Sequence, residues 1–245
     1  MAEAPGLAAS SILPLTATGL SWRAGGVLVL DALTLRIERG TRNVVLGPNG
    51  AGKSVLLRTL HGLLTPTAGR IEWAVADPDR IRRAQAMVFQ RPVMLRRTAL
   101  ENVEFALRVA GVRDGARAAA RQALERVGLS SLAERPARLC SGGEQQRIAL
   151  ARAWALDPEV LFLDEPTASL DPAATRAIEE VVAAMHRAGT TIVMTTHDLG
   201  QARRFADHVL FLHRGRLLED ADAHDFFHHP RSPEAAAFVK GELLW

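Results

Sequence analysis

One stretch, RNVVLGPNGAGKSVLLRTLHGLL at residues 42–64, constrains the fold more than any other part of the sequence. A short apolar run predicts a buried strand, a glycine-rich turn follows it, and apolar residues at helical spacing then predict a helix. The turn matches G-x-x-x-x-G-K-[ST] in the strand–turn–helix context that a phosphate-binding loop requires. The residues of this loop are Gly47, Pro48, Asn49, Gly50, Ala51, Gly52, Lys53 and Ser54.

The residue types of the loop are those that triphosphate binding needs. Glycine lets the backbone wrap closely around phosphate oxygens, so that its N–H groups donate to them. Lys53 can place a cation at the β- and γ-phosphates, and the Ser54 hydroxyl can ligate Mg²⁺. An ordinary glycine-rich turn before a helix is the alternative, but the complete motif in its proper context favours phosphate binding.

Length allows one large domain or two small ones, and composition indicates a soluble globular protein. The chain has 245 residues, of which 48% are apolar and 23% charged, enough for a sizeable core. No run approaches the roughly 18 apolar residues of a membrane-spanning helix. The beginning, MAEAPGLAASSILPL, lacks a basic segment and a long apolar one, so we expect a short leader and not a signal peptide. The single cysteine, Cys140, excludes an internal disulfide and suits the cytosol.

The isoelectric point of about 9.9 does not indicate a nucleic-acid binder, because the net charge is only +3. Lys53 and Lys240 are the only lysines and there is no tyrosine. Almost nothing therefore titrates between neutrality and the arginine range, and a small surplus of cations raises the isoelectric point far. The arginines are scattered through helical patterns with acids between them, which predicts a solvated helical surface and no nucleic-acid partner.

Strand and helix patterns alternate along the chain, with one helical interruption. Residues 16–38 have strand patterns, the pattern from about 92 to 156 is helical, and strand–helix alternation then returns. The sequence predicts an α/β fold with a mainly parallel central sheet, an N-terminal antiparallel β subdomain and an inserted helical subdomain. Within one domain spanning 1–245, we expect a nucleotide-binding core at 14–90 and 157–245 and a helical subdomain at 91–156.

Acidic residues and a histidine follow two later strands. Asp164 and Glu165 come after the apolar run Val160-Leu161-Phe162-Leu163, and His197 ends TTIVMTTHD. Ligands of open parallel sheets bind at the carboxyl ends of strands. Beside a phosphate loop, Asp164 can hold Mg²⁺ and Glu165 can deprotonate an attacking water, although an acidic pair alone is often only solvated.

A second turn suited to an anion lies in LCSGGEQQRIALARA, residues 139–153. Small residues precede a predicted helix, whose first N–H groups point outward and can seat an anion. Two phosphate-binding turns in one chain require an explanation.

In their order along nearly the whole chain, these motifs resemble those of an ATP-binding cassette (ABC) ATPase. Gln90 in MVFQRP matches the glutamine loop of that family, CSGGEQQR its signature, LFLDEP its second nucleotide motif, ASLD ending at Asp171 the loop after it, and TTHD its histidine switch. The resemblance implies ATP and Mg²⁺ as cofactors and hydrolysis of ATP. It implies catalytic roles for Glu165, His197 and Gln90, metal ligation by Ser54, Gln90 and Asp164, and nucleotide contacts from Asp171.

The resemblance also explains the second turn. In this family the signature caps the γ-phosphate of ATP held by the other subunit, so that two chains in head-to-tail apposition enclose two ATP molecules. The residues in that role here are Ser141, Gly142, Gly143 and Glu144. The implied partners are a second copy of the chain, transmembrane permease subunits and, indirectly, an extracytoplasmic solute-binding protein. The implied location is the cytoplasmic face of the cell membrane.

Several positions depart from the family pattern. Val55 follows Ser54 where Thr is usual, Glu144 replaces Gln, and Cys140 replaces Leu. The adenine-stacking aromatic of the family aligns with Ala24, in LSWRAGG. Trp22 lies two residues away, on the same face of a regular strand, and is the candidate substitute, with simple core packing as the open alternative.

Three function classes compete. We expect the energising subunit of an importer, since no membrane domain is fused to the cassette. Soluble cassette proteins of translation or repair resemble tandem cassettes or carry long coiled coils, and a kinase or GTPase has no role for the signature. GKSVLLRTLHGLL and the terminal GELLW look most like tungstate-type oxyanion importers, and the chain ends soon after its last helix, unlike molybdate cassettes with a regulatory domain. Phosphate and polar amino acids remain alternatives, and residues 91–104 should form the groove for a permease helix.

Overall fold

The computed structural model describes residues 11–242. The expected leader falls largely on residues 1–10, and the last three residues of the terminal GELLW also lie outside the described residues. Within 11–242, no helix combines the length and the apolar character needed to cross a membrane.

Strands and helices alternate as the sequence patterns predict, with three helices grouped between β5 and β6. The strands of residues 11–242 are β1 (Leu15–Ala24), β2 (Val27–Ile37), β3 (Arg42–Leu46), β4 (Ala68–Trp73), β5 (Gln85–Val88), β6 (Val160–Asp164), β7 (Thr191–Thr195), β8 (His208–His213) and β9 (Arg216–Asp222). The α-helices of the same range are α1 (Lys53–His61), α2 (Pro78–Arg83), α3 (Ala99–Val109), α4 (Ala116–Arg126), α5 (Gly142–Trp154), α6 (Pro172–Arg187), α7 (Leu199–Phe205), α8 (Ala223–His228) and α9 (Pro233–Val239).

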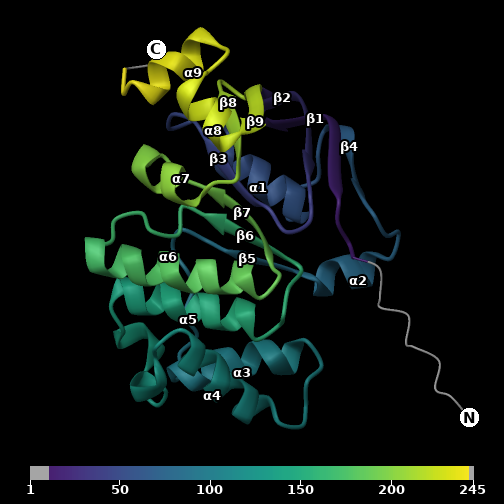
Figure 1. Ribbon diagram of the computed structural model, residues 1–245. Coiled ribbons are helices and arrows are strands. Elements are labelled where there is room, and N and C mark those ends of the chain that lie inside the picture. Colours follow the sequence, from purple (N-terminus) through teal and green to yellow (C-terminus); the bar gives the residue numbers. More distant parts are fainter. Residues whose placement is uncertain (1–10, 243–245) are drawn as a thin grey trace, which may run out of the picture.

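The strands within residues 11–242 form two sheets (Figure 1). The central sheet has the order β5-β6-β7-β3-β8-β9, and every neighbouring pair in it is parallel except β8 with β9. The smaller sheet has the order β2-β1-β4 and is antiparallel. The predicted α/β fold with a mainly parallel central sheet and an N-terminal antiparallel sheet is confirmed.

The central strands β3, β6 and β7 are buried on both faces, and their middle residues are apolar. Along β3, Val44 and Leu46 pack into one core cluster and Val45 packs into another. This alternation follows from the two-residue period of a strand. The first cluster contains residues of α3, α4, α5 and α6, and the second contains residues of α1 and the small sheet. The central sheet therefore separates the helical layer from the antiparallel sheet, as Figure 1 shows.

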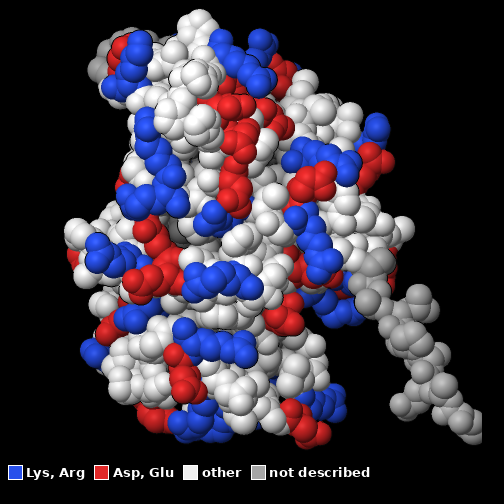
Figure 2. All heavy atoms as spheres, viewed as in Figure 1, with Lys and Arg blue, Asp and Glu red and all other residues white. Residues whose placement is uncertain are grey.

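Charges of both signs are interspersed over the face of the molecule in Figure 2. For example, Arg121 of α4 lies 2.8 Å from the exposed Glu134, and Arg117 of α4 lies 3.3 Å from Glu104 of α3, which is largely buried. An exposed pair such as Arg121–Glu134 contributes little stability. The surface on this face matches the predicted mixture of arginines and acids.

A histidine packed into the fold gives a pH-dependent stability. His61, the last residue of α1, lies edge-on to Phe162 of β6, with ring centroids 5.6 Å apart. Its Nδ1 atom is buried with no hydrogen-bond partner among the described residues. Burial lowers the pKa of His61 to about 4.

We expect His61 to destabilise the fold as the pH falls. In the unfolded chain the His61 imidazole takes up a proton near pH 6.5, whereas in the folded chain it stays neutral down to about pH 4. The contribution of neutral His61 to the free energy of unfolding is therefore complete above pH 6.5 and is lost as the pH falls from 6.5 to 4. The loss should reach about 2–3 kcal/mol. Urea unfolding of His61→Asn across this range should show a flatter pH dependence than the unmodified chain. His224→Asn, at an exposed site, is the matched control, and equal slopes for the two variants would refute the assignment.

Candidate active site

The ends of three neighbouring strands bring the predicted site residues together. The phosphate loop follows β3, Glu165 follows β6 and His197 lies two residues after β7. Thr195 of β7 pairs with Val45 of β3 on one side and with Asp164 of β6 on the other. Because these strands are parallel, their carboxyl ends meet at one edge of the sheet, where ligands of such sheets bind.

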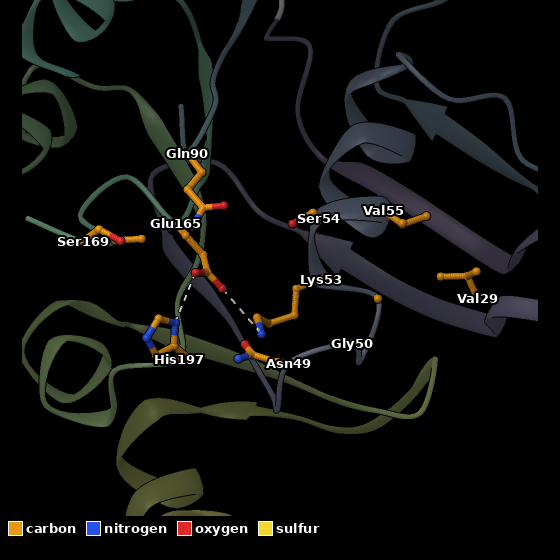
Figure 3. Close-up of a pocket in the computed structure, with 12 residues that line it drawn as sticks. Val29, Asn49, Gly50, Lys53, Ser54, Val55, Gln90, Glu165, Ser169 and His197 are labelled. Atoms are coloured by element: carbon orange, nitrogen blue, oxygen red, sulfur yellow. Dashed lines mark hydrogen bonds and ion pairs between the residues drawn. The ribbon is translucent and has the colours of Figure 1, made fainter. Parts of the chain in front are cut away.

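A cavity of about 530 Å³ opens at this edge (Figure 3). Loop residues, the strand-end residues and one residue of the small sheet surround it. The lining residues are Val29, Asn49, Gly50, Gly52, Lys53, Ser54, Val55, Gln90, Glu165, Ala168, Ser169 and His197. The sequence motifs predicted most of this set. Val29 lies in none of them, and within ASLD the prediction named Asp171, whereas Ala168 and Ser169 line the cavity.

Two glycines give the phosphate loop its shape. Gly47 has φ 149°, and a Cβ atom there would lie 2.1 Å from the Leu212 carbonyl oxygen. Gly52 has φ 102° and precedes α1, and its Cβ would lie 2.9 Å from Leu30 Cδ2. Only glycine fits either position without displacing neighbouring atoms. The loop therefore turns sharply into α1 and leaves the first N–H groups of that helix free for an anion.

Lys53 is held within the loop and lacks full charge compensation. Its Nζ donates to the carbonyl oxygens of Gly47 at 2.8 Å and Pro48 at 3.1 Å, and lies 3.7 Å from Glu165 Oε1. The residue is 5% exposed. Burial lowers the pKa of Lys53, although the Glu165 carboxylate opposes the effect. A triphosphate in the cavity would supply the negative charge that this buried ammonium favours.

Ser54 and Asp164 are joined directly. The Ser54 hydroxyl donates to Asp164 Oδ1 at 2.7 Å, and the Thr195 hydroxyl donates to the same oxygen at 3.1 Å. Arg58 Nη2 lies 3.4 Å from Asp164 Oδ2. The Asp164 side chain is almost fully buried, so these donors stabilise its negative charge. The arrangement fixes two oxygen groups side by side at the start of α1.

Glu165 occupies the position that the sequence predicts for a general base. Its Oε2 lies 3.1 Å from His197 Nδ1, and its Oε1 faces Lys53 (Figure 3). Its backbone has φ 43°, which is uncommon for a residue other than glycine. Its backbone N–H donates to the Thr195 hydroxyl at 2.9 Å. The carboxylate is thus held in place between a cation and an imidazole, at the cavity wall.

The signature residues lie outside this cavity. Ser141 and Glu144 form a reciprocal cap at the start of α5, in which the Glu144 N–H donates to Ser141 Oγ at 3.3 Å and the Ser141 N–H donates to Glu144 Oε2 at 2.6 Å. The Ser141 N–H bond to the Glu144 carboxylate lowers the pKa of Glu144, which stands where the family has Gln. Gly142 lines a separate hollow, which Gln90 and Ser169 also line. Gly143 is buried against Ala174.

Two further predicted residues differ in their relation to the cavity. Asp171 caps α6, since its Oδ1 accepts from the Ala174 N–H at 2.8 Å, and it does not line the cavity. Gln90 lines both the cavity and the hollow beside the signature. Gln146 of α5 donates to the Phe89 carbonyl at 3.2 Å, which ties the residue before Gln90 to the signature helix.

Trp22 lies away from the cavity. It pairs with Leu30 across β1 and β2 and packs, partly buried, against the second core cluster. Val29 of β2 lines the cavity instead. No sequence pattern signals that Val29 lines the cavity in place of Trp22, because its position depends on an irregularity in the pairing of β1 with β2.

The family model described as "ABC transporter" matches residues 30–168. The chain belongs to the ABC transporter family. The phosphate loop, Gln90, the signature and the acidic pair all lie within the matched span. With the family shown and Glu165 positioned at the nucleotide cavity, the chain is an ATPase.

Similar ABC proteins differ in the solutes that their names mention. The chain is 37% identical to the phosphate import ATP-binding protein PstB 2 of Natronomonas pharaonis, over 94% of this chain and 88% of that protein. It is also 37% identical to the tungstate uptake system ATP-binding protein TupC of Peptoclostridium acidaminophilum, over 84% and 98%. A probable amino-acid import ATP-binding protein of Bacillus subtilis, YxeO, is 36% identical over 87% and 91%.

A solved structure of an ABC protein also matches the fold. It is described as the dimeric structure of a post-hydrolysis state of an ATP-binding cassette bound to ADP and Pi. The match has a TM-score of 0.75 and 29% sequence identity, and it covers 85% of this chain and 98% of that chain.

Proposed function

We propose that this chain is the ATP-hydrolysing subunit of a membrane importer. Two copies associate head to tail, enclose two ATP molecules, and transmit closure to permease subunits from the cytoplasmic face of the membrane. An extracytoplasmic solute-binding protein supplies the solute. The similarity to import ATP-binding proteins over most of each chain supports this assignment.

One observation carries the two-chain part of the proposal. The cavity is lined by the phosphate loop, Glu165 and His197, whereas Gly142 at the start of α5 lines only an adjoining hollow. A single chain therefore has two incomplete halves of a triphosphate site. Head-to-tail pairing brings the signature of one chain to the phosphate loop of the other, and ATP favours the closed pair because only its γ-phosphate contacts both halves.

The residues of the cavity divide the work of hydrolysis. Lys53 and the loop N–H groups hold the β- and γ-phosphates and stabilise charge as it develops there. Glu165 accepts a proton from the water that attacks the γ-phosphorus. His197, 3.1 Å from Glu165, orients that carboxylate and reaches toward the same phosphate.

The same edge of the sheet has oxygen groups suited to Mg²⁺. Ser54 Oγ lies 2.7 Å from Asp164 Oδ1, and Gln90 lines the same cavity. Hydroxyl, carboxylate and amide oxygens, with phosphate oxygens, are the ligands that Mg²⁺ prefers. When bound, the ion neutralises charge on the β- and γ-phosphates. Residues 11–242 contain no group of three or more His, Cys, Asp or Glu side chains placed to hold a metal ion.

An apolar groove suits a helix of the permease. A cavity of about 440 Å³ lies beside the predicted 91–104 segment and is lined by Leu95 of that segment together with Leu63, Phe105 and Val109. Leu63 is 51% exposed and Val109 is 71% exposed. Large apolar side chains that are grouped and exposed in this way are typical of a surface that binds a partner. An amphipathic helix laid into such a groove buries these side chains. We assign this groove to the permease; it lies between the helical subdomain proposed at 91–156 and core residues such as Leu63 and Phe89.

Tungstate or a related oxyanion is the proposed solute, on the resemblance of GKSVLLRTLHGLL and the chain terminus to tungstate-type cassettes. The similarity to TupC agrees with it, while PstB 2 and YxeO keep phosphate and amino acids as alternatives. The ATPase does not contact the solute, so the choice depends on its partners.

The test is the ATPase rate of the chain reconstituted with its permease and binding protein in liposomes. We expect stimulation severalfold over the basal rate by tungstate, with molybdate, sulfate, phosphate and glutamine as the comparison panel. Stimulation by phosphate or glutamine, with tungstate inert, would refute the tungstate assignment and leave the importer intact. A complex whose ATPase responds to no solute and drives no uptake would refute the importer itself.

A further inference from the structure

The end of the nucleotide cavity that is remote from Glu165 is aliphatic. In Figure 3, Val29 and Val55 lie on one side of the cavity, and Glu165 and His197 lie on the other, with Lys53 between them. The attacked γ-phosphate belongs beside Glu165, so the nucleoside extends toward the two valines. Neither valine side chain has a hydrogen-bonding atom.

An irregularity in the small sheet sets Val29 at this position. Trp22 pairs with Leu30, and the next residue, Arg23, pairs with Leu28, so that Val29 has no partner across the ladder. A bulge of this kind redirects a side chain, and bulges commonly occur next to active sites. The Val29 carbonyl oxygen would lie 2.4 Å from a Cβ on Gly215 and 3.0 Å from one on Gly52. Backbone on two sides thus fixes the valine before any nucleotide binds.

The aromatic ring nearest in sequence faces elsewhere. Trp22 shares a face with its cross-strand partner Leu30, which is fully buried, and packs with it against the core. At the tip of the hairpin, Ala24 offers a methyl group only, and Val27 and Leu28 are exposed aliphatic residues.

Resting on the proposed function, we propose that the site binds nucleoside triphosphates by their phosphates and accepts any of the common bases. A site that hydrogen-bonds a particular group rejects an analogue without it by about 10⁴-fold or more, whereas apolar contact discriminates far less. Val29 and Val55 can cover a base but cannot distinguish its edge. GTP, CTP and UTP are therefore substrates together with ATP.

Binding of nucleoside diphosphates to the full chain tests this directly, because they occupy the phosphate loop without the γ-phosphate that joins two chains. Calorimetric Kd values for ADP, GDP, CDP and UDP with Mg²⁺ should agree within about fivefold, less than the fold-change of one good stacking contact. A Kd for ADP more than about tenfold below the other three would overturn the inference. Lys53→Ala should abolish the binding of all four nucleoside diphosphates. Absence of any Lys53-dependent binding would overturn the proposed function itself, and the inference with it.

Three substitutions separate the residues involved. Val29→Ser should weaken all four diphosphates by a common factor of about threefold, from the lost apolar contact. Val27→Ser, a matched change at an exposed residue outside the cavity, should leave the Kd values unaltered. Trp22→Leu should change the Kd for ADP by less than about twofold, since its ring faces the core. A selective loss of ADP binding by a folded Trp22→Leu chain would overturn the inference in favour of stacking on Trp22.

Discussion

Glu165→Gln should slow ATP hydrolysis by roughly 10² or more while ATP binding is retained, since a positioned general base contributes about 10²–10⁴ to a rate. The glutamine amide keeps the size of the side chain but cannot accept the proton of the attacking water at pH 7. It also removes the carboxylate that lies 3.7 Å from Lys53 Nζ, which leaves that buried cation free to favour the triphosphate. The measurement is the ATPase rate of the assembled transporter, with the Kd for ATP measured in parallel.

Glu72→Gln is the matched control for this substitution. Glu72 is an exposed carboxylate of β4, 2.8 Å from Arg70, and lies outside the cavity. Its loss should leave the rate unchanged. An undiminished rate for the Glu165→Gln transporter would exclude Glu165 as the base.

Mixing two inactive variants should restore ATP hydrolysis if each site takes residues from two chains. Lys53→Ala damages the phosphate loop, and Ser141→Arg places a bulky cation at the signature. In a mixed dimer, the intact Lys53 of one chain meets the intact Ser141 of the other, so one site is whole and the second carries both defects. We expect the mixture to exceed either variant alone by about tenfold or more, because a lost phosphate contact commonly costs 10²–10³ in rate.

The control for the mixing experiment is each variant mixed with itself under the same conditions. The assay is ATPase activity after co-purification of differently tagged chains, so that only mixed dimers are measured. No recovery in a purified mixed dimer would mean that each chain completes its own site.

The sequence predicted the catalytic end of the site because that end is made of short segments at strand ends. The phosphate loop, Asp164 with Glu165, and His197 each follow an apolar strand, and parallel strands bring such segments to one edge of a sheet. Strand order, which puts β3, β7 and β6 side by side, was not needed for that prediction. The motif predicted glycine at the sharp turns of the loop, and the structure agrees, because Gly47 and Gly52 both have positive φ.

The base end of the site depended on pairing that sequence periodicity cannot show. A regular pair of strands would keep the alternation of side chains on both, but the register shift between Trp22 and Arg23 inserts an extra residue in the partner strand, β2. The extra residue of the bulge is Val29, which the sequence offered as one more β-branched strand residue.

The signature was recognised from its residues, but its local structure adds a feature. Ser141 was expected to direct its hydroxyl to a phosphate, whereas in the single chain that hydroxyl accepts from the Glu144 N–H at 3.3 Å. A hydroxyl that accepts this bond keeps its own hydrogen free to donate to an anion. The cap therefore orients Ser141 for a phosphate of the second chain and is compatible with the predicted role.

The molar mass of the Glu165→Gln chain in Mg-ATP, measured by sedimentation equilibrium and compared with Mg-ADP, tests the two-chain site most directly. With ATP held unhydrolysed, the γ-phosphate should join the two halves, and the protein should sediment at twice the 26.5 kDa chain mass. With ADP it should sediment as a single chain. Adding Ser141→Arg to the same chain should abolish the ATP-dependent dimer. A Glu165→Gln chain that binds ATP and stays monomeric, or a dimer indifferent to the nucleotide and to Ser141→Arg, would contradict the shared site.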